Sequence, residues 1–469
     1  MTSTLASMPL LAHGLSVEIE DVPLPIGTFY AAAAGALVLS FLLLAVGLRT
    51  PRFSSGELRA EPRWLDRLAG TLALRVLART LGVAFLVTLL ATALLGSTLP
   101  AANPAPNLVF VLGWLGLPLA AVVLSHGVLL LHPVAALAKL GGMRDTTPTP
   151  PAPWIGLWIA WLGLFLFTWL ELVYPTATKV RLLGGLSFAW LLLGLVASSR
   201  WGVRAYVERI DPFGTYARLL ASLSQWGLRR DGRLGIRLPL LGANRDVPPA
   251  PGLVALVTLL IGTVSYDGLT RTGWWQERVA LATADLARSG ISAANGRMLF
   301  GTFGFILLAL LAWGAFELAT WAAARIGRLD TGRGLRRAAQ AFAPSLLPIA
   351  LAYVVAHYFS FFVVQVQDLI RYASDPFDAG WNLFGTADRK LRDLHVPSGT
   401  TVWFVQVASI VVGHVAGLLL AHDRALELAP RRPDGTLDYR AATLSQLPLL
   451  ALMLLYTVGG LYFLSEGLA

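Results

Sequence analysis

PIGTFYAAAAGALVLSFLLLAVGL, residues 25–48, is a run of 24 residues without a single charged side chain. A transmembrane helix needs about 20 consecutive, mostly apolar residues, so this run is long enough to cross a bilayer. The first arginines of the chain, Arg49 and Arg52, follow it directly, where such a helix would leave the membrane. The chain therefore begins to look like an integral membrane protein within its first 50 residues.

Nine more apolar runs follow, and they predict an all-α polytopic bundle of about ten spanning helices. Composition agrees, because 56% of the 469 residues are hydrophobic and only 14% are charged. Soluble domains have about 45–50% apolar and about 25% charged residues. No stretch is polar enough to be a soluble domain, so we treat 1–469 as one integral membrane domain. The predicted spans are 25–48, 79–97, 107–131, 153–174, 182–199, 251–268, 298–324, 342–367, 401–421 and 443–465.

Lysine and arginine alternate between the predicted loops. The loops 49–80, 132–152, 200–250, 325–341 and 422–442 carry 27 of the 37 basic residues, and the alternate loops carry the other 10. Cytoplasmic loops keep the excess of Lys and Arg, so we predict a multi-pass plasma-membrane protein with both termini outside. The segments 268–297 and 368–400 are then outward loops.

The net charge of +10 has a membrane explanation. Basic residues cluster at the membrane edges, where they set topology and meet anionic lipid, so we predict the lipid bilayer and no nucleic acid as a partner. Cysteine is absent, which excludes disulfides, thiolate nucleophiles and cysteine-ligated metals. The Gly-rich phosphate loop of ATPases and the Gly-x-Ser-x-Gly motif of serine hydrolases do not occur either.

Two segments outside the spans have apolar residues at helical spacing. Each predicts an interfacial helix on a membrane surface, one in the cytoplasmic loop 200–250 and one in the outward loop 268–297. The alternative for both is a helix packed on the protein's own loops. The apolar residues are Phe213, Tyr216, Leu219, Leu220, Leu223 and Trp226 in the first segment, and Trp274, Trp275, Val279, Leu281 and Leu286 in the second.

Polar side chains at membrane depth are the candidates for function, because an uncompensated polar group in hydrocarbon costs several kcal/mol. His357 in the eighth span and His414 in the ninth come to similar depth, since consecutive spans run in opposite directions and are usually adjacent. Glu171 ends the fourth span, and Asp267 occupies the corresponding end of the sixth. Asp375 lies in an outward loop rich in aspartate, which could cap a site, recruit a cation or only solvate the loop.

Three uses of these residues remain open. Neutral ring nitrogens of His357 and His414 could hold a divalent metal ion. The same residues could pass protons or line a substrate route. Each imidazole could also simply hydrogen-bond a neighbouring helix and fix packing. No metal-binding spacing such as His-Glu-x-x-His occurs. At the N-terminus, a leader ending at Ala12 would leave His13 to bind copper, although an outward extension of the first helix fits residues 1–12 better.

Several of these segments resemble a family of actinobacterial polytopic membrane proteins named fenitrothion hydrolase. The resemblance covers most of the chain and is densest in its last third. One departure is Ser125-His126-Gly127, where an acidic residue after a glycine would be expected. The matching segments are Ala12–Leu15, Phe167–Pro175, Ser265–Leu269, Ala352–Gln367, Ser374–Pro376, Gly380–Thr386, Trp403–Gln406, Gly413–Gly417 and Ala421–Ala425.

The resemblance implies a membrane-bound hydrolase of an apolar organophosphorus triester. Such hydrolysis needs an activated water and stabilisation of developing charge, often from a metal. His357 and His414 would be the metal ligands, and Glu171, Asp267 or Asp375 further ligands or catalytic bases. Two alternatives are a transporter or permease that uses the same polar residues as a pathway, and a non-catalytic subunit of a membrane complex.

Overall fold

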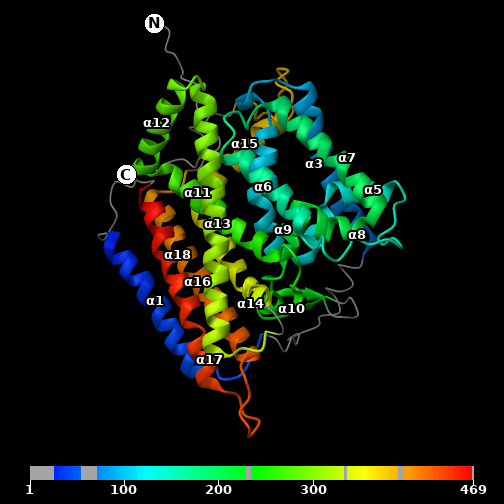
Figure 1. The fold of residues 1–469 in the computed structure, drawn as a ribbon. Coiled ribbons are helices and arrows are strands. Elements are labelled where there is room, and N and C mark those ends of the chain that lie inside the picture. The colour runs from blue at the N-terminus through cyan, green and yellow to red at the C-terminus, as the bar shows by residue number, and fades with distance from the viewer. Residues whose placement is uncertain (1–25, 54–70, 229–233, 332–334, 389–395, 467–469) are drawn as a thin grey trace.

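The computed structural model describes residues 26–53, 71–228, 234–331, 335–388 and 396–466, so the alternative at His13 lies outside the described residues. The described chain is a bundle of helices with one two-stranded antiparallel hairpin (Figure 1). The elements are α1 (Ile26–Gly47), α3 (Leu72–Leu95), η1 (Pro100–Ala102), η2 (Asn107–Leu115), α4 (Gly116–Leu124), η3 (Ser125–Leu131), α5 (Pro133–Leu140), α6 (Trp158–Leu172), α7 (Val180–Trp201), α8 (Val203–Ala205), η4 (Tyr206–Ile210), α9 (Pro212–Ala221), β1 (Trp226–Leu228), β2 (Leu234–Ile236), α10 (Leu241–Asp246), α11 (Leu253–Arg271), α12 (Gly273–Arg288), α13 (Ala293–Gly327), α14 (Leu335–Phe342), η5 (Ala343–Leu346), α15 (Leu347–Ser374), α16 (Gly399–Leu428), α17 (Tyr439–Ser445) and α18 (Leu447–Glu466).

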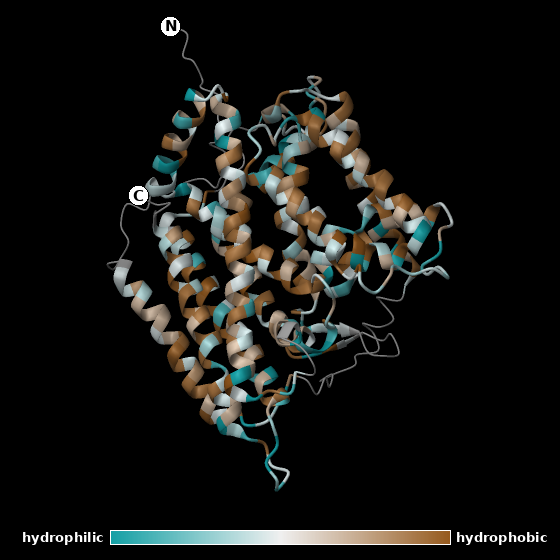
Figure 2. Ribbon diagram, in the orientation of Figure 1, coloured by the Kyte–Doolittle hydropathy of each residue, from teal (hydrophilic) through white to brown (hydrophobic). Residues whose placement is uncertain are grey.

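The prediction of an all-α polytopic bundle is confirmed. Within the described residues, nine helical segments are long and apolar enough to cross a membrane, and each coincides with a predicted span. The remaining predicted span contains α6, whose 15 residues cover about 22 Å at ~1.5 Å per residue. Figure 2 shows that hydrophobic residues, coloured brown, make up much of the long helices.

The third span is irregular along its length. It starts as a π-helical stretch, η2, continues as α4 and breaks at Ser125, which has a positive φ of 52°. The Ser125 hydroxyl donates to the Trp226 carbonyl oxygen at 3.0 Å, so the hairpin strand β1 holds the break in place. His132 and Pro133 then begin α5, with Pro133 in the first turn and the His132 ring accepting from the Ala135 N–H.

Loops of each predicted set contact one another at the two ends of the bundle. At one end, Arg371 and Tyr372 donate to the Ala101 carbonyl, so the last turns of α15 meet the segment after α3. At the other end, Asp423 accepts from the backbone N–H groups of Arg52 and Phe53. These contacts agree with the alternation of the loops. The assignment of one end to the cytoplasm, and of both termini to the outside, stays a prediction.

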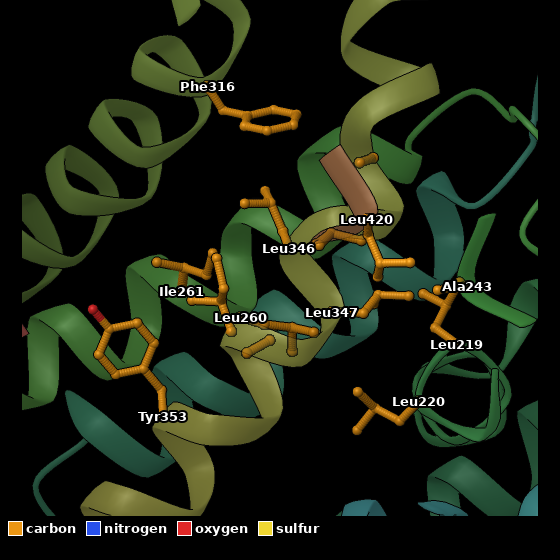
Figure 3. Packing of buried hydrophobic residues seen from close by; sticks show 14 of the residues in the cluster. Leu219, Leu220, Ala243, Leu260, Ile261, Phe316, Leu346, Leu347, Tyr353 and Leu420 are labelled. Atoms are coloured by element: carbon orange, nitrogen blue, oxygen red, sulfur yellow. The ribbon is translucent and has the colours of Figure 1, made fainter. Parts of the chain in front are cut away.

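The helix in the loop 200–250 does not lie on lipid. The expected lipid-facing residues Tyr216, Leu219 and Leu220 on α9 are at most 1% exposed, because α9 packs between α4 and α6. Figure 3 shows Leu219 and Leu220 in the buried core with Leu347 of α15. A helix does form in this segment, but it is buried in the protein on most sides, and Leu223 and Trp226 lie beyond its end.

A buried carboxylate fixes the start of α9. Asp211 is the N-cap residue, and its Oδ2 accepts from the Gly214 N–H at 2.6 Å and lies 3.1 Å from His132 Nε2. Its Oδ1 accepts from Trp190 Nε1 at 2.6 Å and from the Tyr206 hydroxyl at 2.9 Å. Asp211 therefore ties the third span, α7 and η4 to the first turn of α9.

The helix α11 lies at the centre of the bundle. In its spanning window 83% of the residues are buried inside the protein, against 17% for α1 at the periphery. The most extensive contact between two described helices is that of α15 with α16, where a Cβ on Gly413 would lie 2.2 Å from the Ala352 Cβ. Small residues on both helices allow this close approach, as is usual between membrane helices. The helices that carry Asp267, His357 and His414 are thus packed together in the middle of the molecule.

Candidate functional site

Asp267 is the centre of a buried polar cluster. It lies near the end of α11 and is 0% exposed. Its Oδ2 lies 2.6 Å from Nε2 of His357 and accepts from the hydroxyl of Tyr358 at 3.0 Å. The two partners are consecutive residues of α15, and their rings meet edge to face at 4.8 Å. One carboxylate oxygen therefore contacts two consecutive side chains of the neighbouring helix.

Arg271 balances part of the charge of Asp267. It is one helical turn further along α11, and its guanidinium lies 4.0 Å from Asp267 Oδ2. The Arg271 side chain is 23% exposed, whereas the carboxylate is fully buried. A buried charge usually requires such a partner, because the low-dielectric interior does not solvate it. Arg271 is thus the link between the buried cluster and the end of the bundle where α11 meets α12.

Glu171 approaches the cluster from α6. The helix ends one residue later, and Pro175 follows in the connection to α7. Glu171 is 7% exposed and is close enough to Asp267 for their charges to interact. Among the described residues, no group donates a hydrogen bond to its carboxylate. A second acid is thus held beside Asp267 without a direct hydrogen-bond partner from the described chain.

A small cavity joins Glu171 to Tyr358. Tyr216 of α9 and Trp114 of η2 also line it, and its volume is about 10 Å³. A cavity of roughly 10–15 Å³ is enough for one water molecule. A bound water could therefore bridge the carboxylate of Glu171 and the hydroxyl of Tyr358, which itself donates to Asp267.

A second cavity of the same size lies on the other side of the cluster. Its volume is also about 10 Å³, and it is lined by His357, by Ser265 of α11 and by Gly460 of α18. Tyr353 closes it one turn along α15, with its hydroxyl donating to the Tyr456 carbonyl at 2.5 Å. The polar groups thus form a sequence of two one-water cavities with Tyr358, Asp267 and His357 between them.

His414 has different neighbours from His357. Its Nδ1 lies 2.8 Å from the Ile410 carbonyl of its own helix, and its ring meets Tyr353 at 5.8 Å. The other ring nitrogen, Nε2, is buried and has no hydrogen-bond partner in the part of the chain that the structure describes. The structure confirms that α15 and α16 are neighbours, but it directs His357 to Asp267 and leaves His414 outside this cluster.

Asp375 is not brought to the cluster. It lies in the loop after α15, and its carboxylate accepts from the backbone N–H groups of Ala379, Gly380 and Trp381. Although the slight burial acts in the opposite direction, these N–H groups hold the pKa of Asp375 below its ordinary value. The carboxylate therefore closes a turn, which is a role for aspartate that loop sequences often indicate.

This turn gives a testable pH dependence. A carboxylate with a lowered pKa stabilises its turn above the unfolded value of about 3.9, and the effect is lost as the pH falls through the lower folded pKa. We expect the amides of Ala379, Gly380 and Trp381 to lose protection from hydrogen exchange in acid or in Asp375→Asn. Unchanged protection in that variant would show that the carboxylate does not hold the turn.

The predicted metal site finds no support in a ligand cluster. Within the described residues, no group of three or more His, Asp or Glu side chains is arranged to hold a metal ion. A divalent metal shared by His357 and His414 stays a prediction. Tyr216 and Tyr358 were not predicted as functional residues, because neither is adjacent to an acid in the sequence and only the packing of the helices brings them to the cluster. No protein-family model, curated protein or solved structure matches this chain.

Proposed function

We propose that this protein is a membrane transporter in which Glu171, Tyr358, Asp267 and His357 bind and pass a proton. The observation that carries the proposal is the pair of buried acids near the ends of α6 and α11, joined through groups that exchange protons. Intramembrane carboxylates and histidines in such chains are typical of proton relays in pumps and transporters. The integral membrane character is a property of the fold itself.

The order of the groups supports a relay. Glu171 and Tyr358 line one cavity with room for a water, and the Tyr358 hydroxyl donates to Asp267. Asp267 is 2.6 Å from His357, which lines the second cavity. Burying two negative charges together is costly, whereas one proton shared by the two acids leaves a single charge for Arg271 to balance. The cluster is therefore suited to take up one proton and release it again.

The size of the cavities favours a proton over an organic substrate at this place. Pockets for small molecules usually have volumes of about 300–1,000 Å³, and each cavity here has about 10 Å³. An aromatic organophosphorus triester would require the helices around Asp267 to separate. The hydrolase that the family resemblance implied is therefore the less favoured proposal for these residues, and the test below includes it as an outcome.

Infrared spectroscopy of the protein in lipid vesicles tests the proton site directly. We expect the carboxylic acid C=O band of the wild type to change with pH, and this change to disappear in Asp267→Asn and Glu171→Gln. Glu317→Gln is the matched control, because Glu317 is also intramembrane but bonds to Trp313 on its own helix. Spectra that titrate identically in all four proteins would disprove the proposal.

A flux measurement then separates binding from passage. Vesicles that contain a pH-sensitive dye and carry an imposed membrane potential should acidify with the wild type. They should behave like protein-free vesicles with Asp267→Asn. Hydrolysis of an aryl phosphotriester by the purified protein, lost in Asp267→Asn and in His357→Ala, would instead establish the hydrolase.

A further inference from the structure

A groove of about 360 Å³ lies outside the buried cluster, where α11 ends and α12 and α13 begin. Its volume falls in the range of about 300–1,000 Å³ that is usual for small-molecule sites. One wall is α12, which contributes Val279, Ala280 and Thr283, and the facing wall includes Arg297 in the first turns of α13. Trp275 closes the floor, with its ring packed on Gly304.

The groove is cationic at the Arg297 end and has mainly apolar walls beyond it, with Thr270 and Gln276 also lining the end near Trp275. Thr283 packs near Gly296, beside Arg297, while Trp275 packs on Gly304 further along α13. Arg297 and Gly304 are seven residues apart, which is about 10 Å along a helix. Gly304 lies in the membrane-spanning part of α13 and Arg297 at its start, so the cationic end points away from the bilayer and the apolar end towards it.

The cationic end has unused binding capacity. Arg278 and Arg288 of α12 pair with Glu277 and Asp285, but Arg297 makes no ion pair with any residue that the structure describes. The hydroxyl oxygen of Thr283 is buried and has no hydrogen-bond partner in the described part of the chain. An oxyanion at this end would receive charge-assisted hydrogen bonds from Arg297, and a rotation of the Thr283 side chain that exposes its hydroxyl would add a neutral one.

We propose that this groove binds an anionic phospholipid from the leaflet on the α12 side. The phosphate lies at Arg297 and Thr283, and one acyl chain follows Ala280 and Val279 down to Trp275. A lipid fits better than a free phosphate because the apolar half of the groove continues from the anion site towards the hydrocarbon. The proposal does not depend on the proton relay, since none of these residues belongs to the buried cluster.

Native mass spectrometry of the full-length chain, released from micelles that contain phosphatidylglycerol, tests this site. We expect the wild type to retain the lipid, and Arg297→Gln to weaken retention about tenfold through loss of a hydrogen bond to a charged group. Ala280→Phe should displace the lipid by filling the groove, and Ala280 is exposed, so the variant should fold normally. Arg288→Gln is the control, because Arg288 is on the same helix but pairs with Asp285.

Each outcome decides the question. Loss of lipid in both Arg297→Gln and Ala280→Phe, with retention in Arg288→Gln, supports the lipid site. Equal retention in all variants refutes it. Displacement by inorganic phosphate, with no effect of Ala280→Phe, would identify a bare anion site and overturn the lipid assignment. Loss of a dimer in Ala280→Phe would overturn it in favour of a contact between two copies of the chain.

Discussion

Asp211→Ala is expected to lower the free energy of unfolding by about 3–5 kcal/mol, because removing a buried carboxylate leaves the groups hydrogen-bonded to it without a partner. Both carboxylate oxygens are used, by the Gly214 N–H, the His132 ring, Trp190 Nε1 and the Tyr206 hydroxyl. Alanine leaves all four groups buried without an acceptor, and each unsatisfied group costs about 1–3 kcal/mol. It also removes the N-cap of α9, which is worth about 1 kcal/mol.

Unfolding in mixed detergent micelles, followed by circular dichroism, measures this effect. Asp145→Ala is the control, because Asp145 is 64% exposed and pairs only with Lys139, so a change below about 1 kcal/mol is expected. If both variants lost a similar amount of unfolding free energy, the buried network would contribute no more to stability than an exposed ion pair. The destabilisation by Asp211→Asn should lie between those of Asp211→Ala and Asp145→Ala, since the amide accepts at one oxygen but cannot serve all four donors.

The pH dependence of the Asp211 contribution has a defined sign. Burial alone would raise the pKa of Asp211, but His132, the Gly214 N–H and Trp190 together hold it below its ordinary value. A lowered pKa means that the stabilisation is complete above the unfolded value of about 3.9 and disappears as the pH falls through the folded value. The difference between wild type and Asp211→Ala should therefore be constant near neutral pH and shrink only in acid.

Gly413→Ala is expected to destabilise the bundle by about 2 kcal/mol, through overpacking between α15 and α16. The added Cβ would lie 2.2 Å from the Ala352 Cβ and 2.9 Å from the Pro348 carbonyl oxygen. Neither group can rotate away, because one is a Cβ and the other is backbone. The two helices must therefore separate, and this also disturbs the helix that presents His357 to Asp267.

Gly314→Ala provides the matched comparison within a spanning helix. A Cβ at Gly314 meets nothing within 4 Å, so the substitution should be neutral or slightly stabilising. Thermal unfolding monitored by size-exclusion chromatography would separate the two variants. If Gly413→Ala were as stable as Gly314→Ala, the close approach of α15 and α16 in the structure would be wrong.

The candidate site was only partly predictable. Asp267, His357 and Glu171 could be found because ionisable residues are rare in apolar spans, and the structure brings all three to one place. His357 contacts Asp267 and His414 contacts the Ile410 carbonyl, although the helices of the two histidines are neighbours. The rotation of each helix about its axis determines which side chains meet, and a span that is apolar all round contains little information about that rotation.

What the sequence determined by itself was the class of structure: the spans, their number and the alternation of their loops. Length of apolar run and placement of Lys and Arg are local properties, and the bilayer acts on them directly. Only the tertiary structure decided that α9 is buried and that Asp267 meets His357, 90 residues further along the chain. Such contacts depend on how helices pack side by side, where protein and lipid are equally apolar and composition cannot tell them apart.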